Sequence, residues 1–236
     1  GNYIILKNKK NNIAIDAGPS PIKKFSNKYQ AGALSFEFMS NGEKVITNSG
    51  YYNKGNKKLN ELSRSSASHS VLTIDDNSSC KFMKKNNSEF YIKNGLKITH
   101  KDIIYEKNYW KIVAEHDGYL KKYNLLYRRE IEFFLEQNKL IGTEKIVGKN
   151  KIPNLKFDIR FHLYPSTKVM KTQDNKSILI ELEDEGWKFN CENYDINIDN
   201  GLYLGNKNSY KENQNIYISG ISAEDYKIIK WEITKI

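Results

Sequence analysis

The sequence predicts an all-β protein, a large antiparallel two-sheet β-sandwich with little or no helix. Short apolar segments alternate with polar residues at a period of two, and turn-forming residues separate them at close spacing. None of the segments has a convincing apolar period of 3.6 residues. Many short strands of this kind favour an antiparallel sandwich or barrel, and 236 residues suffice for one large core. We expect a single domain over residues 1–236.

The stretch from residue 31 to residue 76 carries the clearest strand signals, and the chain is organised around it. Apolar residues alternate with polar ones in 34–38, which predicts a half-buried strand. Asn41-Gly42 predicts a tight hairpin turn, because both residues tolerate positive φ. Residues 45–48 are the expected return strand, and residues 70–74 a third strand.

Two short strands are expected before this stretch, at residues 3–6 and 12–15. The sequence Ala-Gly-Pro-Ser-Pro at 17–21 then predicts a loop. Residues 53–63 are rich in Lys, Asn and Gly, so we expect an exposed loop there.

Strands are also predicted along the rest of the chain, at 90–92, 96–100, 109–116, 127–135, 140–147, 155–163, 177–182, 187–191, 202–204, 216–219 and 228–233. The alternation is cleanest in 155–163. Phe157 and Phe161 belong to its apolar face, while Asp158, Arg160 and His162 share a polar face that we expect to be exposed.

The formal charge of +10 favours a polyanionic partner. Nearly all of this charge is Lys scattered among Asn and Ile, so a genome-wide compositional habit explains it equally well. Arginines are few, and a nucleic-acid-binding motif is lacking, so we expect no nucleic-acid partner. We also expect no membrane span, because apolar stretches are short. Cys80 and Cys191 do not form a metal motif and can pair only if the fold brings them together.

Motifs in both halves of the chain resemble a known family. The first half contains Asp16-Ala17-Gly18-Pro19, Leu34-Ser35-Phe36-Glu37, Gly42, Ser49-Gly50-Tyr51, Arg64, Ala67-Ser68-His69-Ser70 and Asp75. The second half contains Glu115-His116-Asp117-Gly118-Tyr119, Arg128-Arg129, Ile141-Gly142, Ile159-Arg160-Phe161-His162-Leu163-Tyr164-Pro165, Gly186-Trp187 and Ile229-Lys230-Trp231. In order and spacing, these motifs resemble the C-terminal β-sandwich domain of the heparinase II/III-like family of polysaccharide lyases, within a bacterial subgroup.

The resemblance implies a part of a larger enzyme. Members of the family cleave acidic, uronate-containing glycans by β-elimination in a groove between an N-terminal α/α toroid and the sandwich. The chain starts at Gly1 without Met, so we expect it to be a piece of a longer protein whose toroid precedes it. Much of the catalytic machinery lies on the toroid, so the isolated domain is expected to be inactive, and its catalytic residues remain unassigned. The family resemblance suggests the periplasm or cell envelope, with the cytoplasm as the alternative.

The resemblance also implies a zinc site, which this sequence does not preserve. The corresponding positions are Lys28, Gln30, Gly32, Asn48 and His69. Zinc takes three or four ligands from His, Cys, Asp and Glu, and only His69 qualifies. We therefore expect no zinc cofactor, with Gln30, Asn48 and His69 forming a hydrogen-bonded structural network instead.

Candidate substrate-binding residues are His69, Arg64, Arg160, His162 and Tyr119. Arginine and histidine can neutralise a uronate or sulfate, and tyrosine can stack on a sugar ring. Two of them have a structural alternative: His69 can tie strand ends together, and Arg160 can form an ion pair with an acid on the neighbouring strand.

Three further polar residues are expected to have structural roles. Arg128 should pair with Glu130 or Glu132, Arg129 should need a buried partner, and His116 should cap a turn.

Two functions remain open. The first is the sandwich domain of a lyase acting on acidic glycans, with a degraded metal site. The second is a non-catalytic module that binds anionic glycan or braces a partner domain.

Overall fold

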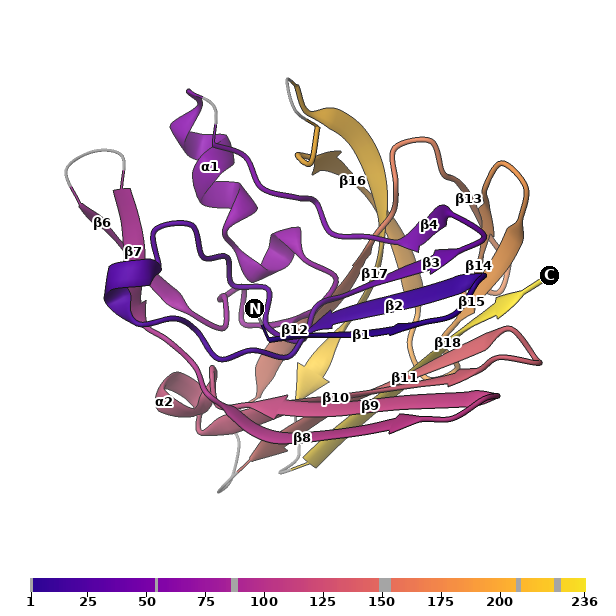
Figure 1. Cartoon of the computed structure of the whole chain (residues 1–236), viewed down its shortest axis with the longest axis horizontal. Helices are drawn as coiled ribbons and strands as arrows, with labels where there is room; N and C mark the ends of the chain where they lie inside the picture. Colours follow the sequence, from indigo (N-terminus) through magenta and orange to yellow (C-terminus); the bar gives the residue numbers. More distant parts are fainter. Residues whose placement is uncertain (1, 54, 86–88, 149–153, 207–208, 223–225) are drawn as a thin grey trace.

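The computed structural model describes residues 2–53, 55–85, 89–148, 154–206, 209–222 and 226–236 (Figure 1). Antiparallel strands dominate this part of the chain, and the helices are few and short. The all-β prediction is therefore confirmed.

The first sheet has the order β1-β2-β3-β4, formed by Tyr3–Lys7, Asn11–Asp16, Phe36–Ser40 and Glu43–Ile46. The predicted hairpin is present, because Asn41 and Gly42 both have positive φ, 45° and 89°. The strand begins two residues later than expected. Leu34 has a φ of 64°, so the chain turns there and enters the sheet at Phe36.

The second sheet has eight strands in the order β13-β14-β15-β18-β11-β10-β9-β8. Its members are β8 (Ile98–Tyr105), β9 (Tyr109–His116), β10 (Leu125–Phe134), β11 (Lys139–Gly148), β13 (Lys168–Lys171), β14 (Ser177–Glu181), β15 (Gly186–Asn190) and β18 (Tyr226–Lys235). The whole of β13 and the second half of β8 were not predicted from the sequence. Both are edge strands whose side chains are largely exposed, so the apolar alternation is weak there.

A third sheet has the order β16-β17-β12-β5, formed by Ile196–Tyr203, Lys211–Ser222, Leu155–His162 and Leu72–Ile74. The third strand of the stretch 31–76 is β5, and it pairs with β12 rather than with the β3–β4 hairpin. A bridge between Thr47 and His162 joins the first and third sheets into one layer.

The two layers meet through aromatic side chains. Phe36 of the first sheet and Phe161 of the third both contact Trp231 of the eight-stranded sheet, with ring centroids 5.6 and 4.8 Å apart. Phe38 packs edge-on against Trp187 at 5.2 Å. Both smaller sheets therefore pack on one large sheet, which is the predicted sandwich.

Short elements cover one end of the sandwich. They are the hairpin β6–β7 (Lys81–Lys85 and Glu89–Asn94), the helices α1 (Lys57–Ser63) and α2 (Leu120–Tyr123), and the 3₁₀ turns η1 (Lys23–Phe25) and η2 (Ser66–Ser68). The exposed loop expected at 53–63 is wrong, because most of it forms α1. Asn56 caps that helix by accepting a hydrogen bond from the Leu59 N–H at 3.1 Å. Within the described residues, the helices are all too short or too polar to cross a membrane.

Candidate functional site

A pocket of about 580 Å³ lies over the outer face of the first sheet. The five positions that correspond to the family's metal motif all line it: Lys28, Gln30, Gly32, Asn48 and His69. They come from the loop before β3, the end of β4 and the residue after η2. The fold thus brings three separate segments together at one place.

Strand alternation supplies the floor of this pocket. Ile13 and Ile15 of β2 point into the core, so Ala14 and Asp16 face outward. Tyr3 of β1 lies opposite Asp16, and Glu37 of β3 lies opposite Ala14. Tyr3, Ala14, Asp16, Ser35 and Glu37 all line the pocket. Tyr3, Asp16 and Glu37 were not predicted as site residues from the sequence, although the period of two in these strands places them on one face.

His69 is a buried, neutral side chain at the wall of the pocket, only 5% exposed. Its Nδ1 lies 2.8 Å from the Ser65 carbonyl, which can only accept, so Nδ1 carries the proton. Burial lowers the pKa of His69 to about 4. Its Nε2 therefore keeps a lone pair and lies 3.2 Å from the Gln30 side chain. Because Nε2 can only accept a hydrogen bond, the Gln30 amide is oriented with its NH₂ group toward Nε2.

Gly32 packs directly against the His69 ring. A Cβ at this position would lie 2.6 Å from His69 Cδ2 and 3.0 Å from Nε2. The imidazole occupies the space that any larger side chain would need, so an Asp at position 32 does not fit this arrangement.

Asn48 belongs to the same wall but does not contact His69 or Gln30 directly. Its Oδ1 accepts the Ser70 N–H at 2.8 Å, and its Nδ2 donates to Glu37 Oε1 at 3.3 Å. The expected network is therefore a Gln30–His69 pair, to which Asn48 is linked through the backbone of Ser70.

The pocket contains two carboxylates that have no ion-pair partner among the described residues, Asp16 and Glu37. Burial raises the pKa of Asp16 to about 6, opposed by a hydrogen bond from the Gly18 N–H. Burial also raises the pKa of Tyr3, with further contributions from Asp16 and Glu37. Although the chain as a whole is basic, this pocket is acidic and rich in hydrogen-bonding groups.

Two of the predicted substrate-binding residues are buried in the protein interior. Arg64 donates to the Tyr29 carbonyl, Asn60 Oδ1 and the Tyr51 hydroxyl, at 2.9 to 3.1 Å. Its guanidinium also lies 5.2 Å from the ring centroid of Phe90. Tyr119 is likewise buried, and its hydroxyl donates to backbone carbonyls of Leu72 and Asn77. These side chains are not open to a sugar; they fix loops.

Arg160 and His162 do not line the pocket, and the exposed polar face expected on β12 is wrong. His162 is 3% exposed and bonds Ser49 Oγ at 3.1 Å and the Ala67 carbonyl at 3.0 Å. Burial lowers its pKa to about 3. Ser49 and Ala67 lie against the His162 ring and cover this face, which the strand's own pattern does not show. Arg160 lies over the ring of Tyr217 on the neighbouring strand β17. It forms an ion pair at 3.5 Å with Asp199, which is on β16, one strand beyond the neighbouring strand that the structural alternative anticipated.

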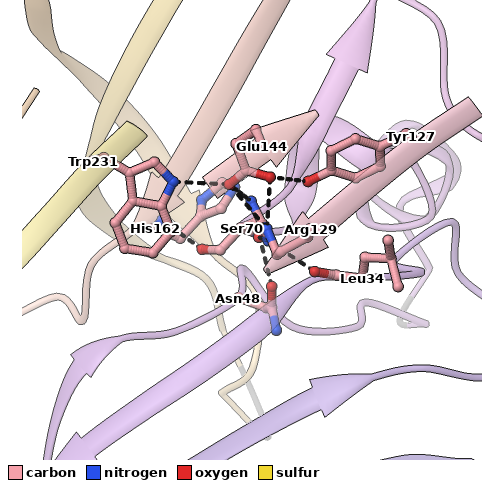
Figure 2. A network of polar contacts seen from close by, with 8 residues as sticks. All are labelled: Leu34, Asn48, Ser70, Tyr127, Arg129, Glu144, His162 and Trp231. Carbon is pink, nitrogen blue, oxygen red and sulfur yellow. Dashed lines mark hydrogen bonds and ion pairs between the residues drawn. The ribbon is translucent and has the colours of Figure 1, made fainter. Parts of the chain in front are cut away.

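The buried partner expected for Arg129 is Glu144 (Figure 2). Arg129 also donates to the carbonyls of Leu34 and Ser70, at 2.8 and 2.6 Å. Leu34 precedes a residue of the pocket floor, and Ser70 follows His69. A network in the core thus holds two segments of the pocket in place.

The remaining structural expectations gave mixed results. His116 accepts the Gly118 N–H on Nδ1, so the turn cap is confirmed. The expected partners of Arg128 are wrong, because it pairs with Glu115 of β9 at 3.0 Å. Cys80 and Cys191 are both buried and free.

Fold and pocket together define a large two-layer β-sandwich domain with a polar pocket on the outer face of one layer. The family model described as Heparinase II/III-like, C-terminal matches residues 1–232, and the chain belongs to this family.

Solved structures of heparinases have the same fold. The heparan sulfate lyase HepC from Pedobacter heparinus superposes with a TM-score of 0.76 at 12% identity, covering 99% of this chain and 34% of that one. A structure named Heparinase III gives 0.73 at 18% identity, covering 99% and 35%. A curated relative, FtsZ-localized protein C from Caulobacter vibrioides, is 23% identical over 94% of this chain and 40% of its own length. The chain thus spans about a third to two fifths of these proteins.

Proposed function

We propose that this chain is the sandwich domain of a heparinase II/III-like polysaccharide lyase that acts on uronate-containing glycans by β-elimination. The observation that carries the proposal is the convergence of Lys28, Gln30, Gly32, Asn48 and His69 on one open pocket. Amide, carboxylate and phenol groups together suit the hydroxyls of a sugar. The names of the structural neighbours, heparinase III and heparan sulfate lyase, support the same substrate class.

The chemistry requires more than this pocket supplies. β-Elimination needs a base near the proton and a group that neutralises the uronate. His69 is a weak base at a pKa of about 4, and the raised pKa of Tyr3 disfavours its phenolate. The described lining residues include no arginine. In our proposal the pocket orients the sugar chain, and an α/α toroid preceding this domain supplies the base and the neutralising group.

We also propose that zinc is not part of this site. Among the described residues, no three His, Cys, Asp or Glu side chains gather closely enough to hold a metal. The donors at the motif positions are two amides and one imidazole, and both Asn48 polar atoms are already hydrogen-bonded. The residues present do not fit a zinc ion.

A non-catalytic module is the second candidate. The missing base favours it. The acidic pocket repels a uronate chain and so favours the form of this module that braces a partner domain. One relative is named for its localisation with FtsZ rather than for an activity. The partner is an acidic glycan under the first proposal, and either a glycan or a partner domain under the second. We also propose a location in the periplasm or cell envelope, with the cytoplasm as the alternative.

The full-length protein, incubated with a set of uronate glycans including heparan sulfate and alginate, separates the two. A lyase would release unsaturated uronates, which absorb in the ultraviolet. We expect product from one of these glycans, with the rate reduced in Glu37→Gln and unchanged in Glu232→Gln, a surface carboxylate paired with Lys139 on the eight-stranded sheet. Glycan binding without any product would replace the lyase by the binding module.

A further inference from the structure

We propose that a second pocket, at the turn of the β3–β4 hairpin, binds one pyranose unit of a glycan chain that also occupies the first pocket. The second pocket has a volume of about 340 Å³. The residues that carry the argument are Met39, Lys44, Tyr164, Thr167, Glu183 and Tyr203. The inference rests on the proposed function only in assuming that the first pocket holds the same chain.

Two tyrosines form an aromatic platform in this pocket. The ring centroids of Tyr164 and Tyr203 lie 5.3 Å apart, and their planes are inclined by 70°. Tyr164 follows the end of β12 and remains 38% exposed. The edge-to-face contact with Tyr203 fixes its ring at the surface. The apolar C–H face of a pyranose can pack on such a ring while its hydroxyls reach outward.

Polar groups surround this platform. The Lys44 ammonium lies 5.6 and 5.8 Å from the centroids of the Tyr164 and Tyr203 rings, and 3.5 Å from the Tyr203 hydroxyl. The ion pairs among the described residues do not include Lys44, so its charge is available to a ligand. Thr167 is nearly buried, and its hydroxyl has no hydrogen-bond partner in the described part of the chain. A sugar hydroxyl bound here would satisfy such groups.

The far wall of the pocket is fixed by a backbone contact. Glu43 accepts the Glu183 N–H at 2.8 Å, which ties the β14–β15 turn to the β3–β4 hairpin. Glu183 itself is exposed and lines the pocket. The pocket thus combines aromatic rings with a Lys, a Glu and a hydroxyl. These groups suit a sugar ring as the ligand better than they suit a small isolated anion.

The two pockets lie along one surface. Glu37 lines the first and Met39 the second, and both belong to the outer face of β3, roughly 7 Å apart along the strand. The walls are joined as well, because the Leu204 N–H, next to Tyr203, donates to the Ser49 carbonyl, next to Gly50 of the first pocket. A glycan can therefore pass from one pocket to the other without leaving the sheet face.

The test measures how affinity depends on glycan length. The full-length protein is titrated with uronate oligosaccharides from disaccharide to octasaccharide, prepared from heparan sulfate and from alginate. We expect Tyr164→Ala to weaken octasaccharide binding about tenfold and to leave disaccharide binding unchanged, because only the longer chain reaches the second pocket. Tyr164→Phe should retain wild-type affinity, since the ring face is kept. Tyr105→Ala, an exposed tyrosine on β8, is the matched control and should have no effect.

Other outcomes separate this inference from the proposed function. The inference of a second sugar-binding pocket is wrong if Tyr164→Ala weakens the binding of long and short oligosaccharides equally, or weakens neither. In that case, loss of binding in Glu37→Gln would still support sugar binding at the first pocket. Weakening by Tyr164→Ala with no effect of Glu37→Gln overturns the joint occupancy of the two pockets by one chain, and with it the proposed role of the first pocket, and leaves a sugar site at the second pocket alone. If the wild-type protein binds none of these oligosaccharides, both proposals are wrong.

Discussion

Arg129 and Glu144 form an ion pair in the middle of the sandwich, with 2.7 Å between Nη2 and Oε1 and neither side chain exposed to solvent. Tyr127 and Trp231 donate to the same carboxylate. The Nη1 atom of Arg129 donates to the carbonyls of Leu34 and Ser70. The buried charge pair therefore holds residues at both sides of the candidate site (Figure 2). Such a pair tolerates removal of one partner poorly, because the remaining charge is left uncompensated.

We therefore expect Glu144→Gln to lower the free energy of unfolding by about 3–5 kcal/mol. Urea denaturation measures it. Glu232→Gln removes a carboxylate from a pair that is about one third exposed and should cost less than about 1 kcal/mol. Equal costs for the two variants would show that the buried pair has no special role.

Gly32→Ala should lower the free energy of unfolding by about 1–3 kcal/mol, because the new methyl group overlaps the His69 ring. A double-mutant cycle tests the cause. In a His69→Ala background the ring is absent, so the same substitution at Gly32 should cost much less. Identical costs in both backgrounds would mean that the strain lies in the backbone.

His69→Ala by itself is expected to be destabilising by about 1–3 kcal/mol, since it removes the hydrogen bond to the Ser65 carbonyl and opens a space against Gly32. His100→Ala, on the exposed face of β8, is the control and should be neutral. An unchanged melting temperature in His69→Ala would contradict the structural role of this residue.

Acid should destabilise the protein through its buried histidines. Burial lowers the pKa to about 4 in His69 and His116 and to about 3 in His162. The unfolded chain takes up these protons near pH 6.5, whereas the folded chain does not, so stability decreases as the pH falls from about 6.5 to about 4. The free energies of unfolding obtained from urea titrations at pH 7 and at pH 4.5 should differ by an amount on the order of several kcal/mol. Constant stability over this range would show that the rings are protonated in the folded state.

Asp16 should act in the opposite direction. Burial raises its pKa to about 6, so the folded protein binds a proton more tightly than the unfolded chain, and stability is lost as the pH rises from about 4 to about 6. We expect Asp16→Asn to be more stable than the wild type at pH 7, by on the order of 1–3 kcal/mol, and equally stable below pH 4. Asp102→Asn, at an exposed position on β8, is the control and should leave the stability at pH 7 within about 0.5 kcal/mol of the wild type.

Metal analysis of the purified protein should find well below one zinc per chain. Gln30→His combined with Asn48→Asp supplies two further ligands beside His69, and this variant should bind zinc more tightly than the wild type. One equivalent of zinc in the wild type would overturn our interpretation of these amides.

The sequence alone determined the class of fold and the location of the family motif. The alternation in 155–163 and the Asn41-Gly42 turn are local properties, because side chains point to opposite faces of a strand and a tight turn needs residues that accept positive φ. The sequence also shows directly that four of the five metal-motif positions hold polar residues, Lys28, Gln30, Asn48 and His69.

Only the tertiary structure decided which polar residues are buried and with which partners. His162 lies on the polar face of its strand, but Ser49 and Ala67 cover its side chain. Glu144 became the partner of Arg129 because β11 is the neighbour of β10 in the large sheet. A period of two distinguishes the two faces of a strand and says nothing about what lies over either, since that depends on strand order and on packing between segments distant in the chain.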